Sequence, residues 1–153
     1  MADFSHLNHS AQGQMVDITT KAPSHRKARV EGCVKVSQDC MEKLTGDMIR
    51  EISSTARIAG TQAAKATSQL IPYCHPLALT KVTIEIEVVE WSFRLSATAK
   101  TVGTTGVEME ALVACQIAAA TIYDMIKAVD PSAVLGPFQL VEKSGGKSGE
   151  WAP

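Results

Sequence analysis

The sequence predicts an α+β fold of the ferredoxin-like type, in which two long helices cover one face of a four-stranded antiparallel sheet. Residues 82–88 and 91–99 alternate apolar and polar side chains across a short turn, which is typical of a β-hairpin. A long helical pattern precedes this hairpin and another follows it, and a strand pattern stands at each end. The resulting order, βαββαβ, is that of the ferredoxin-like plait.

The first half of the chain contains an arm, a strand and a helical region. Residues 1–27 are polar and irregular, so we expect a partly ordered N-terminal arm before a single domain at 28–153. Apolar and charged side chains alternate over 28–36, which predicts a half-buried strand. The alanine-rich stretch within 38–70 predicts helix, with Thr-Gly-Asp at 45–47 as a candidate break.

The second half begins with two prolines that end the helix. Proline disfavours helical geometry in the residue before it, so Ile71 and His75 should be extended. The hairpin follows, and then a second long helix over 107–129 that ends at an Asp-Pro pair. An apolar strand at 134–141 and a glycine-rich tail complete the expected elements.

Composition excludes several classes of function. The net charge is −1, with 15 basic and 16 acidic residues, so no overall field favours nucleic acid or an acidic membrane. The four cysteines are far apart and form no CxxC pair, which argues against a zinc site or a disulfide framework. We find no secretory leader and expect no segment apolar enough to span a bilayer. A cytoplasmic protein is therefore expected.

Two glutamates stand at the start of the second helix, beside a turn rich in threonine and glycine. Glu108 and Glu110 could simply complement the helix dipole. Alternatively, such carboxylates could accept hydrogen bonds from the amide and amino edge of a guanine or pterin ring. The residues alone leave both interpretations open.

Asp124 and Lys127 share one face of the same helix because they are three residues apart. They could form an ordinary surface ion pair. Their neighbours are mostly apolar, however, and a carboxylate and an ammonium in a dry crevice shift each other's proton affinity. We therefore also consider them as an acid–base pair.

Three further segments offer binding groups. Tyr73, Cys74 and His75 lie between two prolines on what should be a rigid loop, where a binding role competes with a structural one. Lys65 belongs to a basic stripe on the first helix that is either solvated or phosphate-binding. Lys143 and Lys147 lie in the glycine-rich tail, which is either a solvated tail or an anion-binding segment. The tail is not a P-loop, because the first glycine and the following helix are missing.

Taken together, these segments resemble the MoaC family, the cyclic pyranopterin monophosphate synthases. The resemblance covers nearly the whole chain in one order. It rests on Met15-Val16-Asp17, Ala56-Arg57-Ile58-Ala59-Gly60 with Ala63-Ala64-Lys65, Leu70-Ile71-Pro72-Tyr73-Cys74-His75-Pro76-Leu77, Thr105-Gly106-Val107-Glu108-Met109-Glu110-Ala111-Leu112, Thr121-Ile122-Tyr123-Asp124-Met125 with Lys127-Ala128-Val129, and Lys143-Ser144-Gly145-Gly146-Lys147-Ser148-Gly149.

The resemblance implies a lyase of molybdenum cofactor biosynthesis. Its substrate would be (8S)-3',8-cyclo-7,8-dihydroguanosine 5'-triphosphate, supplied by a partner radical enzyme, and pyrophosphate would leave as cyclic pyranopterin monophosphate forms. It also implies a homohexamer, a trimer of dimers with sites at the dimer interface. No cofactor is implied with certainty; Mg²⁺ bound to the triphosphate is the one candidate, and no protein metal site is expected. Asp124 and Lys127 match catalytic positions, and residues 73–75 with Met109 and Glu110 match substrate-contacting segments.

One position departs from the family pattern. Family members usually carry Lys-Gly-Asp before the first long helix, and that lysine is catalytic. Here Thr45 precedes Gly46-Asp47, whereas counting back from Arg57 puts Ile49 in the lysine's place. Either alignment loses the lysine, with Lys43 and Arg50 as candidate substitutes. The alternative function is therefore a nucleotide- or pterin-binding homologue without activity. A structural oligomer without a ligand would leave the charged residues on apolar helices unexplained.

Overall fold

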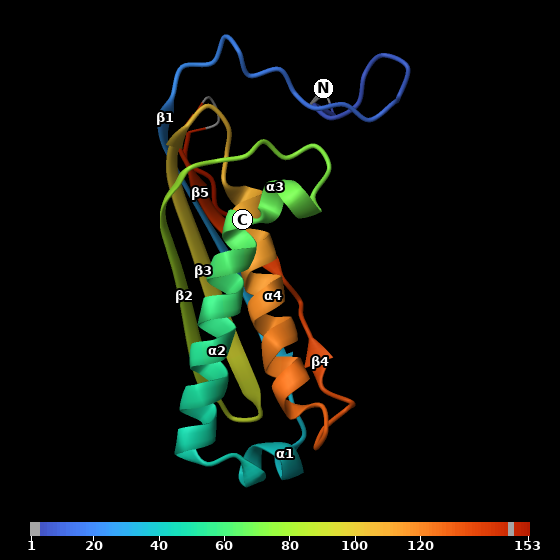
Figure 1. Ribbon diagram of the computed structural model, residues 1–153, viewed down its shortest axis with the longest axis vertical. Helices are drawn as coiled ribbons and strands as arrows, with labels where there is room; N and C mark the ends of the chain where they lie inside the picture. The colour runs from blue at the N-terminus through green and yellow to red at the C-terminus, as the bar shows by residue number, and fades with distance from the viewer. Residues whose placement is uncertain (1–3, 147–148) are drawn as a thin grey trace.

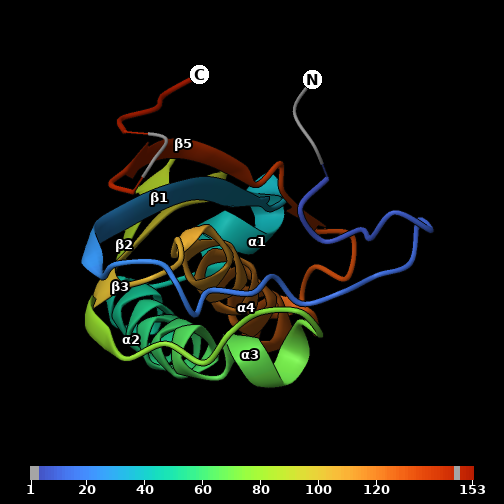
Figure 2. The same ribbon diagram turned by 90° about the horizontal axis from the view of Figure 1, so that it is seen from above.

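The computed structural model describes residues 4–146 and 149–153, and it confirms the predicted fold class. All strand pairs in the one sheet are antiparallel, in the order β2-β3-β1-β4, and β5 also pairs with β1. Helices α2 and α4 cover one face of this sheet (Figure 1, Figure 2). The elements are β1 (Ser24–Lys35), α1 (Gln38–Lys43), α2 (Gly46–Lys65), α3 (Thr67–Leu70), β2 (Leu79–Val89), β3 (Ser92–Gly103), α4 (Glu108–Ile126), β4 (Val134–Leu135) and β5 (Gln139–Ser144).

The strands differ from the expected ones at their ends. β1 begins at Ser24, so the last residues of the expected arm belong to the sheet, where they pair with the end of β3. The expected strand at 134–141 is divided into β4 and β5 by residues 136–138. Phe138 lies against Gly32 of β1, where a Cβ atom would overlap its ring. Because of this packing, residues 136–138 leave the hydrogen-bonded ladder with β1. The contact joins residues far apart in sequence, so the alternation of apolar and polar residues does not reveal it.

The first helical region is divided as its sequence suggested. Thr45 is the N-cap of α2, and its hydroxyl accepts a hydrogen bond from the Met48 amide at 3.3 Å. The helix is therefore broken near the predicted place, at Leu44 and Thr45, whereas Gly46 and Asp47 already belong to α2. A second interruption, at Ala66, was not expected. It precedes the buried Thr67, whose hydroxyl donates back to the carbonyls of Ala63 and Ala64.

Helix α4 lies at the centre of the molecule. Its alanine-rich face packs on β1 and β3 and against α2, and Ala111, Ala114, Ala118 and Ile122 are fully buried. Among the described residues, α4 alone is long and apolar enough to cross a membrane, so our expectation of no such segment is wrong by length and composition. Half of the relevant window is buried inside the fold, as in the core helix of a folded domain.

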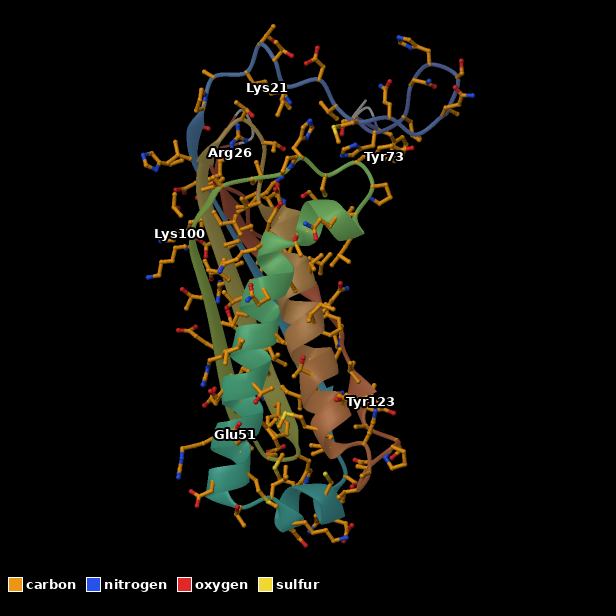
Figure 3. All side chains as sticks on the ribbon, viewed as in Figure 1. Lys21, Arg26, Glu51, Tyr73, Lys100 and Tyr123 are labelled. Carbon is orange, nitrogen blue, oxygen red and sulfur yellow. The ribbon has the colours of Figure 1, made fainter. Side chains whose placement is uncertain are left out.

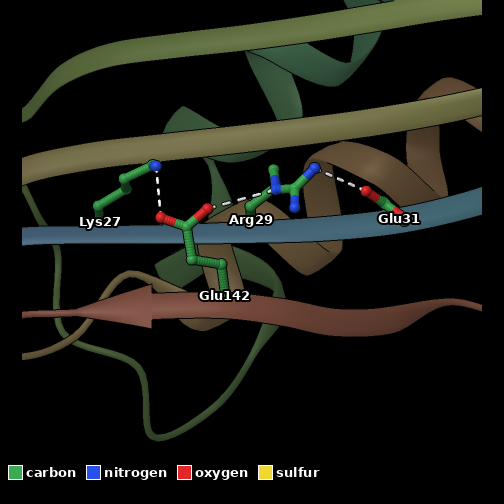
Figure 4. A network of polar contacts seen from close by, with 4 residues as sticks. All are labelled: Lys27, Arg29, Glu31 and Glu142. Atoms are coloured by element: carbon green, nitrogen blue, oxygen red, sulfur yellow. Dashed lines mark hydrogen bonds and ion pairs between the residues drawn. The ribbon is translucent and has the colours of Figure 1, made fainter. Parts of the chain in front are cut away.

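Ion pairs connect β1 with β5 on the face of the sheet that the helices leave open. Glu142 of β5 accepts a hydrogen bond from Lys27 and forms an ion pair with Arg29 of β1, and Arg29 donates to Glu31 (Figure 4). These side chains are about one third to one half exposed, so each pair contributes little to stability. They do place the end of β5, and with it Lys143, beside β1.

Gly60 permits the close approach of α2 to α4, which gives the first prediction. A Cβ atom there would meet Ile84 Cδ1 and lie 2.7 Å from the Ala114 carbonyl oxygen. We expect Gly60→Ala to lower the free energy of unfolding by about 1 to 2 kcal/mol, because overpacking outweighs the better helix propensity of alanine. Urea unfolding measures this. Gly46→Ala is the control, because nothing lies within 4 Å of its added atom. Equal stability of the Gly60 variant and the parent would contradict the packing described.

Candidate active site

Two adjoining cavities lie where α4 begins. The smaller has a volume of about 340 Å³ and the larger about 660 Å³. Both are lined by Lys21 of the arm, by Thr105 and Gly106 of the β3–α4 loop, and by Glu108. Lys21, Arg26 and Tyr73 therefore gather at one end of the molecule, far from Tyr123 at the other (Figure 3). The two cavities are built from segments that are distant in sequence.

The smaller cavity brings together most of the predicted substrate-binding residues. Its wall contains Tyr73, Cys74 and His75 from the loop after α3, and the first turn of α4 supplies the acids opposite them. The complete predicted set found here is Tyr73, Cys74, His75, Glu108, Met109 and Glu110. The loop is shaped by its prolines: Ile71 is extended, as predicted, and the Cys74 amide donates to the Ile71 carbonyl at 3.1 Å.

Glu110 is the buried acid of this cavity. Only 4% of the residue is exposed. Burial raises the pKa of its carboxyl, and the neighbouring charge of Glu108 raises it further. Burial also raises the pKa of the Cys74 thiol, and the charge of Glu110 raises it further. Cys74 therefore remains protonated at neutral pH, and the cavity offers a neutral thiol beside a carboxyl that holds its proton more tightly than usual.

The larger cavity is cationic, although the chain as a whole is nearly neutral. Lys21, Arg26, Lys27 and Lys143 line it, against the single carboxylate of Glu108 among the described lining residues. The Lys143 ammonium donates to Glu108 at 3.1 Å, and both side chains are about one third exposed. A local excess of positive charge in a cleft favours a polyanionic ligand. Lys143 and Glu108 link this cationic wall to the start of α4.

Arg26 holds the loops around the larger cavity. Its Nε donates to the Gly103 carbonyl at 3.1 Å and its Nη2 to the Thr104 carbonyl at 3.3 Å. Gly145 and Gly146 have φ angles of 99° and 69°, and the backbone of Gly146 lies against the guanidinium. A side chain at either glycine would be strained and would overlap β1. Part of the glycine-rich tail is thus an ordered rim.

The tail returns along β5 beyond this rim. The amides and carbonyls of Lys143 and Trp151 bond each other in both directions at 2.9 Å. Lys143 and Trp151, near the two ends of the tail, are therefore held by backbone hydrogen bonds, and the interpretation of a merely solvated tail is wrong for them. Lys147 lies outside the described residues.

Asp124 and Lys127 lie at the opposite end of α4. The Lys127 ammonium donates to Asp124 at 2.6 Å, which raises the pKa of Lys127. The expected dry crevice is not formed by this chain, because the Asp124 and Lys127 side chains are 70% and 55% exposed. Lys65 is also exposed, at the last residue of α2, and lines neither cavity.

The family assignment follows from comparison with known proteins. A family model described as "MoaC family" matches residues 15–146. The chain belongs to the MoaC family. Cyclic pyranopterin monophosphate synthase of Corynebacterium efficiens is 45% identical over 154 residues, covering 99% of both chains. The protein of the same name from Geobacillus thermodenitrificans is 45% identical over 157 residues, covering 99% of this chain and 97% of its own.

Similar chains also occur among solved structures, and one of them has a stated fold. It is the solution structure of a de novo designed protein with a ferredoxin fold, aligned over 74% of this chain and 83% of its own with a TM-score of 0.42 and 10% identity. The sheet order established above is the basis of the fold assignment. No three His, Cys, Asp or Glu side chains gather into a metal-binding group within residues 4–146 and 149–153.

The departure from the MoaC pattern lies at the same end as Asp124. Thr45 caps α2, and the half-buried Ile49 packs against the core. The two candidate substitutes are both exposed and paired: Lys43 with Asp39 and Arg50 with Asp47. Lys43 also lines a hollow of about 320 Å³ with Met125, next to Asp124 on α4, whereas Arg50 does not line it. Of the two, Lys43 is thus the one that faces the hollow beside the end of α4.

Sequence reasoning missed three cationic residues that line the larger cavity of this MoaC chain. Lys21, Arg26 and Lys27 fell within the expected arm and show no periodicity, so no local pattern marked them as functional. The Thr105-Gly106 loop stood out in the sequence, but only the structure shows that it lines both cavities beside these cations.

The raised pKa of Glu110 predicts a pH-dependent effect on stability. Its carboxyl binds a proton more tightly in the folded chain, so its contribution is fully present below the unfolded pKa and is lost as pH rises through the folded value. Glu110→Gln, which stays neutral, should therefore be more stable than the parent at about pH 8, and the difference should vanish below about pH 4. Urea unfolding across this range measures it. A pH-independent difference would contradict the assigned protonation.

Proposed function

We propose that this chain is a cyclic pyranopterin monophosphate synthase, a lyase that converts (8S)-3',8-cyclo-7,8-dihydroguanosine 5'-triphosphate to cyclic pyranopterin monophosphate and pyrophosphate. The observation that supports this most strongly is a cationic cavity joined to an acid-lined one, in a chain 45% identical over nearly its full length to synthases of that name. The pathway is molybdenum cofactor biosynthesis.

The two cavities suit the two ends of a nucleotide triphosphate. Lys21, Arg26 and Lys143 present ammonium and guanidinium groups that pair well with phosphoryl oxygens. Lys147 would add to them, and Mg²⁺ would accompany the triphosphate. The carboxyl groups of Glu108 and Glu110 in the smaller cavity accept hydrogen bonds from the amide and amino edge of the ring system. Volumes of a few hundred cubic ångströms are usual for such ligands.

The chemistry needs proton transfer as well as binding. When the cyclic phosphate closes, a hydroxyl oxygen attacks the innermost phosphorus, its proton passes to a base, and the bond to pyrophosphate breaks. The cations of the larger cavity stabilise the charge that develops on the leaving pyrophosphate. Asp124 and Lys127 are the acid–base pair that we assign to the proton transfers.

Asp124 and Lys127 reach the substrate from a second chain. Glu110 and Asp124 are 14 residues apart on α4, which separates their backbones by about 21 Å. One chain would thus place the acid–base pair far from its own cavities, whereas a two-fold dimer would place it beside its partner's. Closure against a partner would also remove water from Lys127, which lowers an ammonium's pKa and frees its proton for transfer. A trimer of such dimers is the hexamer we propose.

The partners and location follow from this proposal. A radical enzyme must supply the substrate, because its ribose carbon is already bonded to the purine. The site accommodates a small-molecule triphosphate, and we propose a cytoplasmic protein that acts without nucleic acid or membrane. The non-catalytic alternative rests only on the missing lysine. No contact in the described part of the chain favours it.

Removing the acid–base pair should abolish the reaction. We expect Asp124→Asn and Lys127→Ala each to lower kcat by about 100-fold or more, the usual effect of losing an acid–base group, while folding and assembly persist. Product formation from the cyclised triphosphate measures kcat, and circular dichroism and gel filtration check the fold and assembly. Lys35→Ala on the open sheet face is the control. Near-normal turnover in either variant would refute the assignment.

Subunit exchange tests whether the pair acts across an interface. Inactive Glu110→Ala and inactive Asp124→Asn proteins are mixed, and exchange is followed with two fluorescent labels. Shared sites should restore part of the activity, because each mixed dimer regenerates one intact site. Exchange without any return of activity would confine the site to one chain.

The larger cavity predicts a salt-dependent affinity. We expect Lys21→Ala and Lys143→Gln each to weaken binding of a triphosphate by about tenfold, because a charge-assisted hydrogen bond is lost. Binding should also weaken as salt increases, and less steeply in the variants. Calorimetric titration with guanosine triphosphate at several salt concentrations measures both effects, again with Lys35→Ala as control. Salt-independent affinity of the parent would count against the site.

A further inference from the structure

Residues 4–14 of the N-terminal arm, which we call the cap loop, form an ordered turn next to the smaller cavity. Leu7 and Gly13 form a β-bridge, and the Gln14 amide donates to the His6 carbonyl at 2.8 Å. The Asn8 carboxamide oxygen accepts from the amides of Ser10 and Gln12 at 2.9 Å each. The cap loop precedes the range 15–146 that matches the MoaC family model.

The cap loop contacts Tyr73 of the smaller cavity. The ring of His6 stacks on the Tyr73 ring, with centroids 6.2 Å apart and planes inclined by 17°. Gly13 approaches the edge of the same ring: a Cβ atom there would lie 2.7 Å from Tyr73 Cε2 and Oη. His6 Nδ1 lies 3.2 Å from the Gln14 carbonyl oxygen, which fixes the imidazole over the phenol. The loop thus touches a face and an edge of Tyr73.

Tyr73 needs such support. Pro72 and Pro76 restrict the residues before them, Ile71 and His75, whereas Tyr73 itself is 41% exposed. Ser5 and His6 line the smaller cavity together with Tyr73. An aromatic wall that is held before binding lowers the entropic cost of forming the complex.

We infer that His6 is a positioning residue that holds the Tyr73 ring as the wall against which the ring system of the substrate binds. Gly13 completes the support, because its missing side chain leaves room for the ring. The identity of the ligand in this inference rests on the proposed function. The contact between cap loop and Tyr73 does not.

Five variants separate stacking from the other effects of His6. His6→Ala removes both the ring and its hydrogen bond, His6→Phe keeps a ring, and His6→Asn keeps a polar group without one. Gly13→Ala should displace Tyr73 by overlap. His9→Ala is the matched control, because this exposed histidine of the same loop does not line the cavity.

The first measurement is independent of activity. The chain has two tyrosines, so NMR spectra of tyrosine-labelled protein contain the signals of Tyr73 and of Tyr123, which serves as an internal reference at the far end. His6→Ala, His6→Asn and Gly13→Ala should shift the Tyr73 ring signals, whereas His9→Ala should not. Unchanged Tyr73 signals in all variants would overturn the stacking contact.

The second measurement tests the role in binding. We expect His6→Ala, His6→Asn and Gly13→Ala to weaken guanosine triphosphate binding and raise KM by about fivefold, the size of an aromatic-pair effect, with kcat within about twofold. His6→Phe should restore both values. Altered Tyr73 signals without a change in affinity or KM would overturn the positioning role. An inactive parent that still shows the affinity pattern would refute the synthase assignment and leave the positioning role standing.

Discussion

The packing of α4 between the sheet and α2 is the constraint on which the rest of the molecule depends. Alanines form most of its buried face, so the helix lies close to β1 and β3, and Gly60 lets α2 approach it. Close contact along its whole length fixes both ends of α4 relative to the sheet. Its first turn therefore holds Glu108 and Glu110 against the arm, the loop after α3 and the β3–α4 loop, and its C-terminal end holds Asp124 and Lys127 at the far end. The packing of this core helix therefore fixes the positions of the proposed functional side chains, because both of its ends reach the surface.

Much of the fold could be predicted because its signals are local. Alternation in the hairpin, alanine-rich helical stretches and paired prolines each depend on a few neighbouring residues. The division of the last strand by Phe138 and the early start of β1 depend on contacts between distant segments, and no window of sequence contains them. The same reason explains the site. Glu108, Glu110 and residues 73–75 stood out locally, whereas Lys21 and Arg26 gained meaning only when the arm met the β3–α4 loop.

Charge shows why overall composition says little about the ligand. The chain is almost neutral, yet four cationic side chains face one acid in the larger cavity. One of the four, Lys27, also pairs with Glu142, outside the lining of the cavity. Acids balance cations elsewhere in the chain too: Glu142 pairs with Arg29, and Asp39 pairs with Lys43 at the far end. A ligand in the cleft experiences the nearby charges far more strongly than the distant ones, because solvent and salt screen the latter. The local arrangement, rather than the net charge, selects a polyanion.

The lost family lysine can be understood from the local energetics of α2. A lysine at position 45 would remove the N-cap hydroxyl, at a cost of about 1 kcal/mol, and would place a cation at the positive end of the helix dipole. A lysine at position 49 would replace an isoleucine that packs against the core, and would bury part of its stem without a partner for the ammonium. In both alignments, therefore, the position that would carry the lysine holds a residue that stabilises the fold: Thr45 caps α2, and Ile49 packs against the core. Lys43 is the last residue of α1, three positions before α2 begins. Its side chain is exposed and lines the hollow beside the end of α4. An ammonium there can swing away from Asp39 at little cost, since an exposed pair of this kind contributes only a few tenths of a kcal/mol. We propose that Lys43 of α1 supplies the charge that α2 lacks, without any change in the packing of the core.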